Sequence, residues 1–359
     1  MKKTVILYTF FLLCCSASAQ SKEIWNAFWN KDTTAIGFKD KNGIIKIKPK
    51  FMGITIAHKF ENIIAVTEQV NNKWKSYYLT KSGKIVGEGS LYSFDNGPDC
   101  ENEGFIRFTD YKIDKMGMFN GEGKIIIPAE YSNLSKVKNG MILALKGAKK
   151  KQDGEYFYWT GGKEFLIDVN NKVLIEKFAY NDDLNFYSVE KSKEVSKDPI
   201  RDSFLGIDGQ YYSFINFDKE FKEWLQNDLL KDLSKTNLEK HSFDKIIYWK
   251  EITGWTNKSK IKFINQNYTL LKLKLQELKN PKTDYFVSSD GLNPFIFESS
   301  EYDLYFNNCH EAKEWQYPVK NIVITPKREV GIKQDHIQFL KTENGYKLIS
   351  ISLGEDNLE

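Results

Sequence analysis

The chain has 359 residues and a formal net charge of only +4, with 52 basic against 48 acidic side chains. A balance this even gives no reason to expect a polyanionic partner. Arginine, whose planar side chain recognises phosphate and guanine, occurs only at positions 107, 201 and 328, so the composition argues against nucleic-acid binding.

Residues 1–19 are predicted to be a secretory signal peptide. Two lysines precede the apolar run 5–15, and Ala17 and Ala19 have the spacing of a cleavage site. A lipoprotein signal would place a small residue before its acceptor cysteine, whereas Leu13 precedes Cys14. No later run reaches the roughly 18–20 apolar residues of a membrane span. We therefore expect an exported chain, periplasmic or secreted, with no transmembrane span.

A sequence repeat organises residues 37–145. Each unit has a polar turn, a glycine and then a β-branched apolar run, and the glycines stand at positions 43, 83 and 123, 40 residues apart. An aromatic residue follows eight residues after the first and third glycines, at Phe51 and Tyr131. Such runs predict strands joined by hairpins. Meanders this small cannot bury their own apolar faces, so neighbouring units are expected to share a core.

A degenerate fourth unit is predicted at 156–175. Its turn, Asn170-Asn171-Lys172, lies 48 residues after Gly123 and contains no glycine. Terminal repeats are commonly irregular because they cap the array.

The repeat resembles the WG (or KWG) β-repeat proteins. The likeness lies in Gly37–Phe51 and Lys115–Tyr131 and extends over residues 35–175. Each unit keeps one member of the name-giving Trp-Gly pair, at Ile36-Gly37, Trp74-Lys75 and Met116-Gly117. The resemblance implies an interaction or envelope-associated module over residues 20–180. It provides no catalytic residue and no cofactor to transfer.

The second half of the chain has a different period. Residues 181–212 are rich in charge and are predicted to be an irregular linker. Asp218 is expected to cap a helix with an apolar row from Phe221 to Leu233. A second helix is expected over 261–278, before a proline.

Strands are expected after the two helices. They are predicted at 285–288, 295–298, 302–306, 319–325, 336–342 and 346–353, the last two joined by the hairpin turn Asn344-Gly345. This order predicts an α+β domain over residues 213–359 and is similar to nuclear-transport-factor-2-like domains of exported bacterial proteins. The predicted fold class is an all-β repeat domain of antiparallel meanders, followed by a smaller α+β domain with an antiparallel sheet.

The acidic loop 95–103 is the first candidate site. Asp95, Asp99, Glu101 and Glu103 offer the hard oxygens that Ca²⁺ accepts, although a solvated loop explains the composition more simply. The same carboxylates are a candidate pair for glycoside hydrolysis, which needs two groups about 5 to 10 Å apart.

The two cysteines beyond the signal peptide, Cys100 and Cys309, either form a disulfide between the two halves or remain unpaired, since spacing alone does not fix the pairing. Cys309-His310-Glu311 is a tempting trio, but neighbouring strand residues point to opposite faces. The four histidines show no metal-binding spacing.

The lysines at 146 and 149–151 are expected either at a solvated hairpin tip or in contact with an acidic glycan or lipid headgroup.

These patterns favour a non-catalytic, envelope-associated binding protein whose β-repeat surface contacts a protein or glycan partner. The alternative is a hydrolase with its active site in the C-terminal α+β domain. No metal ion or cofactor is expected under the first interpretation.

Overall fold

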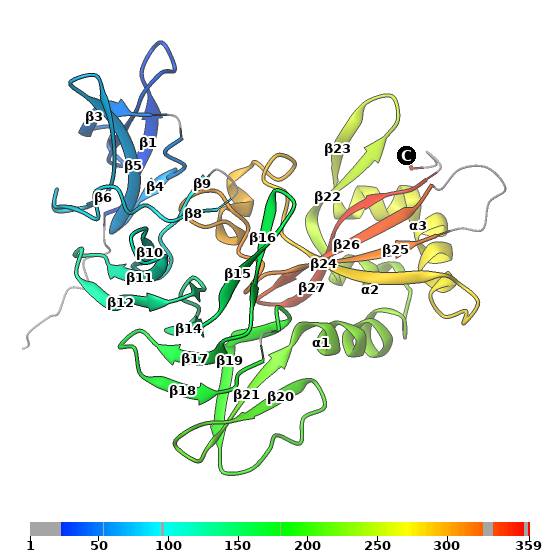
Figure 1. The fold of residues 1–359 in the computed structure, drawn as a ribbon. Helices are drawn as coiled ribbons and strands as arrows, with labels where there is room; N and C mark the ends of the chain where they lie inside the picture. The colour runs from blue at the N-terminus through cyan, green and yellow to red at the C-terminus, as the bar shows by residue number, and fades with distance from the viewer. Residues whose placement is uncertain (1–22, 53, 95–96, 180, 326–332, 355–357) are drawn as a thin grey trace, which may run out of the picture.

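The computed structural model describes residues 23–52, 54–94, 97–179, 181–325, 333–354 and 358–359. The predicted signal peptide therefore lies outside the described residues, and so does Asp95. The fold is mainly β, with several antiparallel sheets, as the sequence predicts. In Figure 1 the strands of the first half succeed one another along one side of the molecule, and a sheet with helices forms the other side.

Four three-stranded antiparallel meanders occupy residues 25–176. In each one the middle strand pairs with the strands before and after it. They are β1 (Trp25–Trp29), β2 (Ile36–Lys39) and β3 (Ile45–Phe51); β5 (Ile63–Val70), β6 (Lys73–Thr80) and β7 (Ile85–Val86); β10 (Phe105–Asp110), β11 (Lys115–Asn120) and β12 (Ile125–Tyr131); and β14 (Met141–Lys146), β17 (Lys163–Asp168) and β18 (Val173–Glu176). The first two meanders and β4 (Lys59–Phe60) share one seven-stranded sheet.

The same turn joins the second and third strands of all four meanders. A side-chain oxygen accepts a hydrogen bond from the backbone N–H four residues later, at 2.8–3.0 Å. The four acceptors are Asp40, Thr80, Asn120 and Asp168. Three residues after each acceptor the backbone is left-handed, with φ of +82°, +87° and +68° at the three repeat glycines and +62° at Asn171. Asparagine tolerates this conformation, so the fourth turn forms without glycine.

Strand register also repeats. Ile36 pairs with Phe51 and Phe38 with Ile47, and the same pairings recur 80 residues later in the third meander. A bulge in the third strand presses against the middle strand at Gly37 and Gly117. A Cβ on Gly117 would lie 2.7 Å from the Ile127 carbonyl oxygen, so this position of the repeat requires glycine.

An inserted hairpin explains why the fourth turn is out of step. Strands β15 (Lys149–Asp153) and β16 (Tyr156–Thr160) lie between the first and second strands of the fourth meander and pair only with each other. The sequence places the fourth unit at 156–175, but its second strand begins only at Lys163.

The predicted linker over residues 181–212 is wrong. Strands β19 (Leu184–Ser192), β20 (Arg201–Leu205) and β21 (Tyr211–Asn216) form an antiparallel sheet in the order β19-β21-β20. The charge-rich run falls at the end of β19 and in the following loop, whereas buried Phe186 and Phe214 anchor the strands. The turn between β20 and β21 repeats the earlier backbone pattern, with Gly209 at φ +75°.

The last part of the chain contains a six-stranded sheet in the order β23-β22-β27-β26-β25-β24. Its strands are β22 (Ser242–Lys250), β23 (Gly254–Ser259), β24 (Tyr285–Asp290), β25 (Val319–Ile324), β26 (Asp335–Thr342) and β27 (Gly345–Ser352). Neighbours are antiparallel except β22 and β27. The terminal hairpin forms as predicted, whereas β22 and β23 have no counterpart among the predicted strands.

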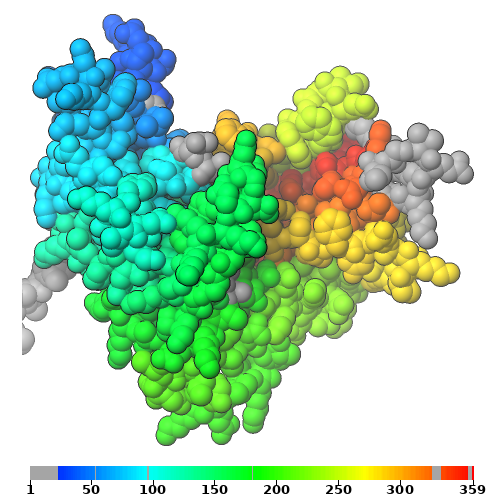
Figure 2. All heavy atoms as spheres, in the orientation of Figure 1, coloured from blue at the N-terminus to red at the C-terminus, as the bar shows by residue number. Residues whose placement is uncertain are grey.

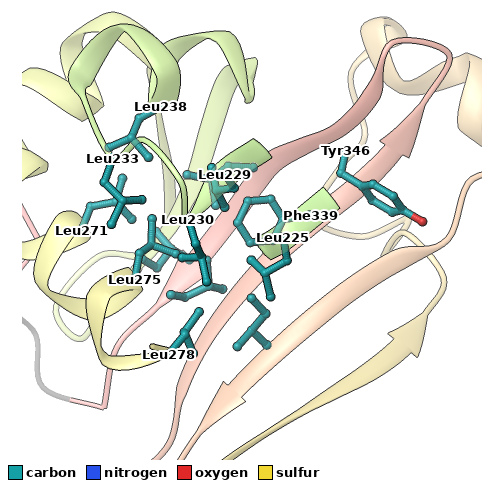
Figure 3. Packing of buried hydrophobic residues seen from close by; sticks show 14 of the residues in the cluster. Leu225, Leu229, Leu230, Leu233, Leu238, Leu271, Leu275, Leu278, Phe339 and Tyr346 are labelled. Carbon is teal, nitrogen blue, oxygen red and sulfur yellow. The ribbon is translucent and has the colours of Figure 1, made fainter. Parts of the chain in front are cut away.

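Three α-helices accompany this sheet in the described chain: α1 (Phe217–Trp224), α2 (Lys235–Lys240) and α3 (Lys260–Glu277). A π-helical turn, Leu225–Leu229, continues α1. Figure 3 shows the leucines of these segments gathered near Phe339 of the sheet, where they belong to a buried apolar cluster. Asn216, and not the predicted Asp218, caps α1, because its side chain accepts from the N–H groups of Asp218 and Lys219.

The segment between β24 and β25 folds back onto the meanders. The predicted strands at 295–298 and 302–306 are absent from it, and Ser300–Tyr305 forms a 3₁₀ helix instead. Tyr302 and Tyr305 are both buried, and their spacing of three matches the 3₁₀ period. The Asn308 carbonyl accepts hydrogen bonds from the N–H groups of His58 and Lys59, both at 2.9 Å. The two halves of the chain therefore share an interface.

One buried histidine predicts a pH effect on stability. His241 is 8% exposed and packs edge-on against Trp224, and burial, followed by the charges of Lys240 and Lys347, lowers its pKa. Below about pH 6.5 the unfolded chain binds a proton that the folded chain does not, so stability is lost as the pH falls. We expect urea unfolding of His241→Gln to depend less on pH between neutral pH and about pH 5 than that of the wild type. Identical pH slopes would contradict this assignment.

Candidate functional site

A cleft of about 650 Å³ lies between the meanders and the segment that joins β24 to β25, residues 291–318, which we call the returning segment. Strand β8 (Ser93–Phe94), β9 (Gly97–Pro98) and β13 (Asn133–Leu134) supply lining residues together with β10, β14 and β17. The opposite wall comes from residues 311–315. The lining residues are Tyr92, Phe94, Gly97, Pro98, Asp99, Arg107, Asn133, Leu134, Ser135, Lys136, Lys138, Leu143, Ala144, Leu145, Glu164, Phe165, Glu311, Ala312, Glu314 and Trp315.

A buried ion pair lines the cleft. Arg107 donates to Asp99 through Nε at 2.9 Å and Nη2 at 2.6 Å, and its Nη1 donates to the Leu134 carbonyl at 2.9 Å. The guanidinium lies 4.5 Å from the centre of the Tyr92 ring. Burial alone would raise the pKa of Asp99, but the charge and hydrogen bonds of Arg107 outweigh it and hold that pKa below its usual value. Both side chains are therefore fixed and charged.

A second ion pair closes one side of the cleft. Lys136, from the loop after β13, pairs with Glu311 of the returning segment. Trp315, only 8% exposed, lies beneath Lys136 and Lys138, whose Nζ atoms are 5.8 and 5.7 Å from its ring centre. Burial lowers the pKa of Lys138. In contrast, Phe94 is 77% exposed and presents its ring at the rim.

A smaller pocket of about 200 Å³ shares Lys138, Glu314 and Trp315 with the cleft. Its other lining residues include three aspartates, Asp182, Asp183 and Asp290. Beside it, the fully buried Lys320 of β25 bonds to Asp183 at 3.1 Å and to Asp218 at 2.5 Å. Lys320 thereby ties the sheet to the start of α1 and to the segment before β19.

No protein-family model and no curated protein matches the chain.

The structure joins Cys100 and Cys309 in a disulfide, with 6.1 Å between their Cα atoms. Both cysteines belong to the buried cluster of the first meanders, which includes Phe38 and Phe60. The bond attaches the returning segment to the array two residues before Glu311, so it holds the two walls of the cleft together. This arrangement is the first of the two alternatives that the sequence left open.

The three described acids of the predicted calcium loop have separate partners. Asp99 bonds to Arg107, and Glu101 accepts from the backbone N–H groups of Asn62 and Ile63 at 3.0 and 2.9 Å. Glu103 accepts from the N–H groups at 139 and 140 and from a tyrosine hydroxyl. Within the described ranges, no group of three potential metal ligands comes together. The three acids are close in sequence, but their carboxylates bind different partners and do not converge on one site.

The Cys309-His310-Glu311 trio is also dispersed. Cys309 is in the disulfide, Glu311 pairs with Lys136, and the His310 ring stacks on His58 with 5.3 Å between centres. Sequence reasoning missed Arg107. The alternation of the strand could have indicated it. Ile106 and Phe108 are buried on one face of the strand, so Arg107 between them lies on the opposite face.

Proposed function

We propose that the chain is a non-catalytic binding protein of the cell envelope, with a WG-type β-repeat domain followed by an α+β domain. The turn that recurs in all four meanders and the register shared by the first and third support the repeat assignment. The N-terminal pattern of residues 1–19 supports export. Among the described residues, no helix combines the length and apolar character needed to cross a bilayer.

The cleft is the observation that carries the binding proposal. Its volume of about 650 Å³ lies within the range of ligand sites in proteins. Its two walls are connected by a disulfide between cysteines that are 209 residues apart in the sequence. A site whose walls are already fixed loses little conformational freedom when a ligand enters, which favours binding.

Of the two expected partner classes, the lining favours a glycan. Tyr92, Phe94 and Phe165 line the cleft, and the exposed ring of Phe94 offers a face on which the C–H face of a sugar can stack. The charges of Asp99 and Arg107 neutralise each other, so this part of the lining does not require a charged ligand. A protein segment is the alternative occupant, and the experiment below distinguishes the two.

Phe94→Ala is expected to weaken glycan binding. Because Phe94 is 77% exposed, its truncation removes a stacking surface at little cost in stability. We expect about a tenfold rise in Kd, as stacking contributes roughly 1–1.5 kcal/mol. The measurement is calorimetric titration of the chain from residue 20 with oligosaccharides released from the envelope.

Trp74→Ala is the matched control, because Trp74 is 56% exposed and lies outside the cleft lining. The proposal requires Phe94→Ala to lose affinity and Trp74→Ala to retain it. If no envelope oligosaccharide binds, but an envelope protein is retained by the wild type and lost by Phe94→Ala, the occupant is a protein. Equal binding by the wild type and both variants would show that the cleft is not the binding site.

A further inference from the structure

The hairpin β15–β16 is unlike the rest of the array. Its two strands pair only with each other, while β14 and β17 on either side continue the fourth meander. In Figure 2 it stands out from the molecular surface as a narrow arm. A two-stranded hairpin gains little stability in water by itself, so an exposed one calls for a functional explanation.

The arm combines consecutive aromatic residues with consecutive lysines. Strand β16 carries Tyr156, Phe157 and Tyr158, which are 80%, 50% and 45% exposed, followed by Trp159. Strand β15 carries Lys149, Lys150 and Lys151, all exposed. Large rings this exposed, next to one another, are unusual on a surface that contacts only water.

The register places rings and lysines on both faces of the arm. Lys151 pairs with Tyr158 on one face, and Lys150 pairs with Trp159 on the other. The Lys150 Nζ lies 4.7 Å from the centre of the Phe157 ring and 5.2 Å from that of Trp159. Both faces of the arm therefore carry aromatic rings, and neither face is purely polar.

Not all of the charge on the arm is already neutralised. Lys150 pairs with Asp114 of the third meander at 2.7 Å. Within the described chain, Lys149 and Lys151 have no ion-pair partner, and Lys151 only approaches the Tyr158 ring, at 5.7 Å. Two cations therefore remain available to an anionic surface.

We propose that this arm binds the anionic surface of a lipid bilayer. Tyrosine and tryptophan prefer the boundary between headgroups and acyl chains, and lysine extends its amine to the phosphates. A binding site for a protein or a sugar would present rings on one face only. Rings on both faces suit partial immersion in the headgroup region of a bilayer. Asp153 and Glu155 lie at the tip, so the arm rests along the surface and does not insert tip first.

Vesicle sedimentation tests the proposal. The chain from residue 20 is used, because the apolar run 5–15 would itself bind lipid. We expect it to sediment with vesicles that contain phosphatidylglycerol, to bind pure phosphatidylcholine weakly, and to be released by high salt. Lys149→Glu/Lys151→Glu should weaken binding at least tenfold, since each basic residue contributes about fivefold at such a surface.

A triple variant, Tyr156→Ser/Phe157→Ser/Tyr158→Ser, should lose binding to a similar extent. Trp74→Ser and Lys41→Glu/Lys48→Glu are controls with exposed residues on other meanders, and they should bind as the wild type does. Circular dichroism melts check that every variant is folded. The proposal fails if the wild type ignores anionic vesicles, if the arm variants bind as well as the controls, or if only a soluble anionic glycan competes for the lysines. This test does not involve the cleft, so its outcome is independent of the proposed glycan binding.

Discussion

Replacing Arg107 with alanine is expected to lower the free energy of unfolding by about 3–5 kcal/mol. The side chain of Asp99 is only 2% exposed, so the substitution leaves a buried carboxylate without its counter-charge. The Leu134 carbonyl loses a donor as well, and the Tyr92 ring loses its stacked cation. The effect is measurable as a shift of the urea unfolding midpoint.

A double variant separates charge from packing. Asp99→Asn/Arg107→Met removes both charges and keeps most of the volume, so it should recover a large part of the stability that Arg107→Ala loses. If Arg107→Ala unfolds at the wild-type urea concentration, Asp99 is hydrated and the buried pair does not exist. If the double variant is no better than the single variant, the loss arises from packing and not from the unpaired charge.

Removing the disulfide is the second large change. Cys100→Ser/Cys309→Ser opens a loop with a sequence separation of 209 residues. Closing a loop of that length restricts the unfolded chain strongly, and we expect the variant to lose about 3–5 kcal/mol of stability. The variant should also bind the cleft ligand more weakly, because only non-covalent contacts, among them the Lys136–Glu311 pair and the hydrogen bonds to Asn308, would then hold the returning segment against the meanders.

Thiol labelling shows whether the bond exists in solution. The chain from residue 20, unfolded without reductant, should contain no reactive thiol, and reduction should expose two. Two reactive thiols before reduction would establish the unpaired alternative. In that case the Cys→Ser variant would also have nearly wild-type stability.

The local signals in the sequence predict local structure well. A glycine before a β-branched run identifies the turn at Gly43, Gly83 and Gly123, because only a left-handed residue closes that turn. The oxygen-bearing side chains that complete the turns share the period of the glycines, at Asp40, Thr80 and Asn120, but differ in residue type. A comparison of the units by residue type therefore does not identify these side chains.

Non-local features were less predictable. The charge-rich run within residues 181–212 led to the prediction of a linker where β19, β20 and β21 form. These strands are buried against Phe178 and Leu166 of preceding segments, and that contact cannot be read from the run itself. The aromatic run at 302–306 has strand composition, but its tyrosines face a buried cluster at helical spacing. The cleft combines residues up to 223 positions apart, from Tyr92 to Trp315, and no single-sequence pattern specifies such proximity.

The central claim is that the cleft between the meanders and the returning segment holds a partner from the envelope. The most direct measurement places a photo-crosslinking amino acid at position 94 of the mature chain, irradiates it with an envelope fraction and identifies the adduct by mass spectrometry. Position 74 serves as the exposed control. We predict a discrete glycan adduct at position 94 and none at position 74. The same unspecific adducts at both positions would contradict the claim.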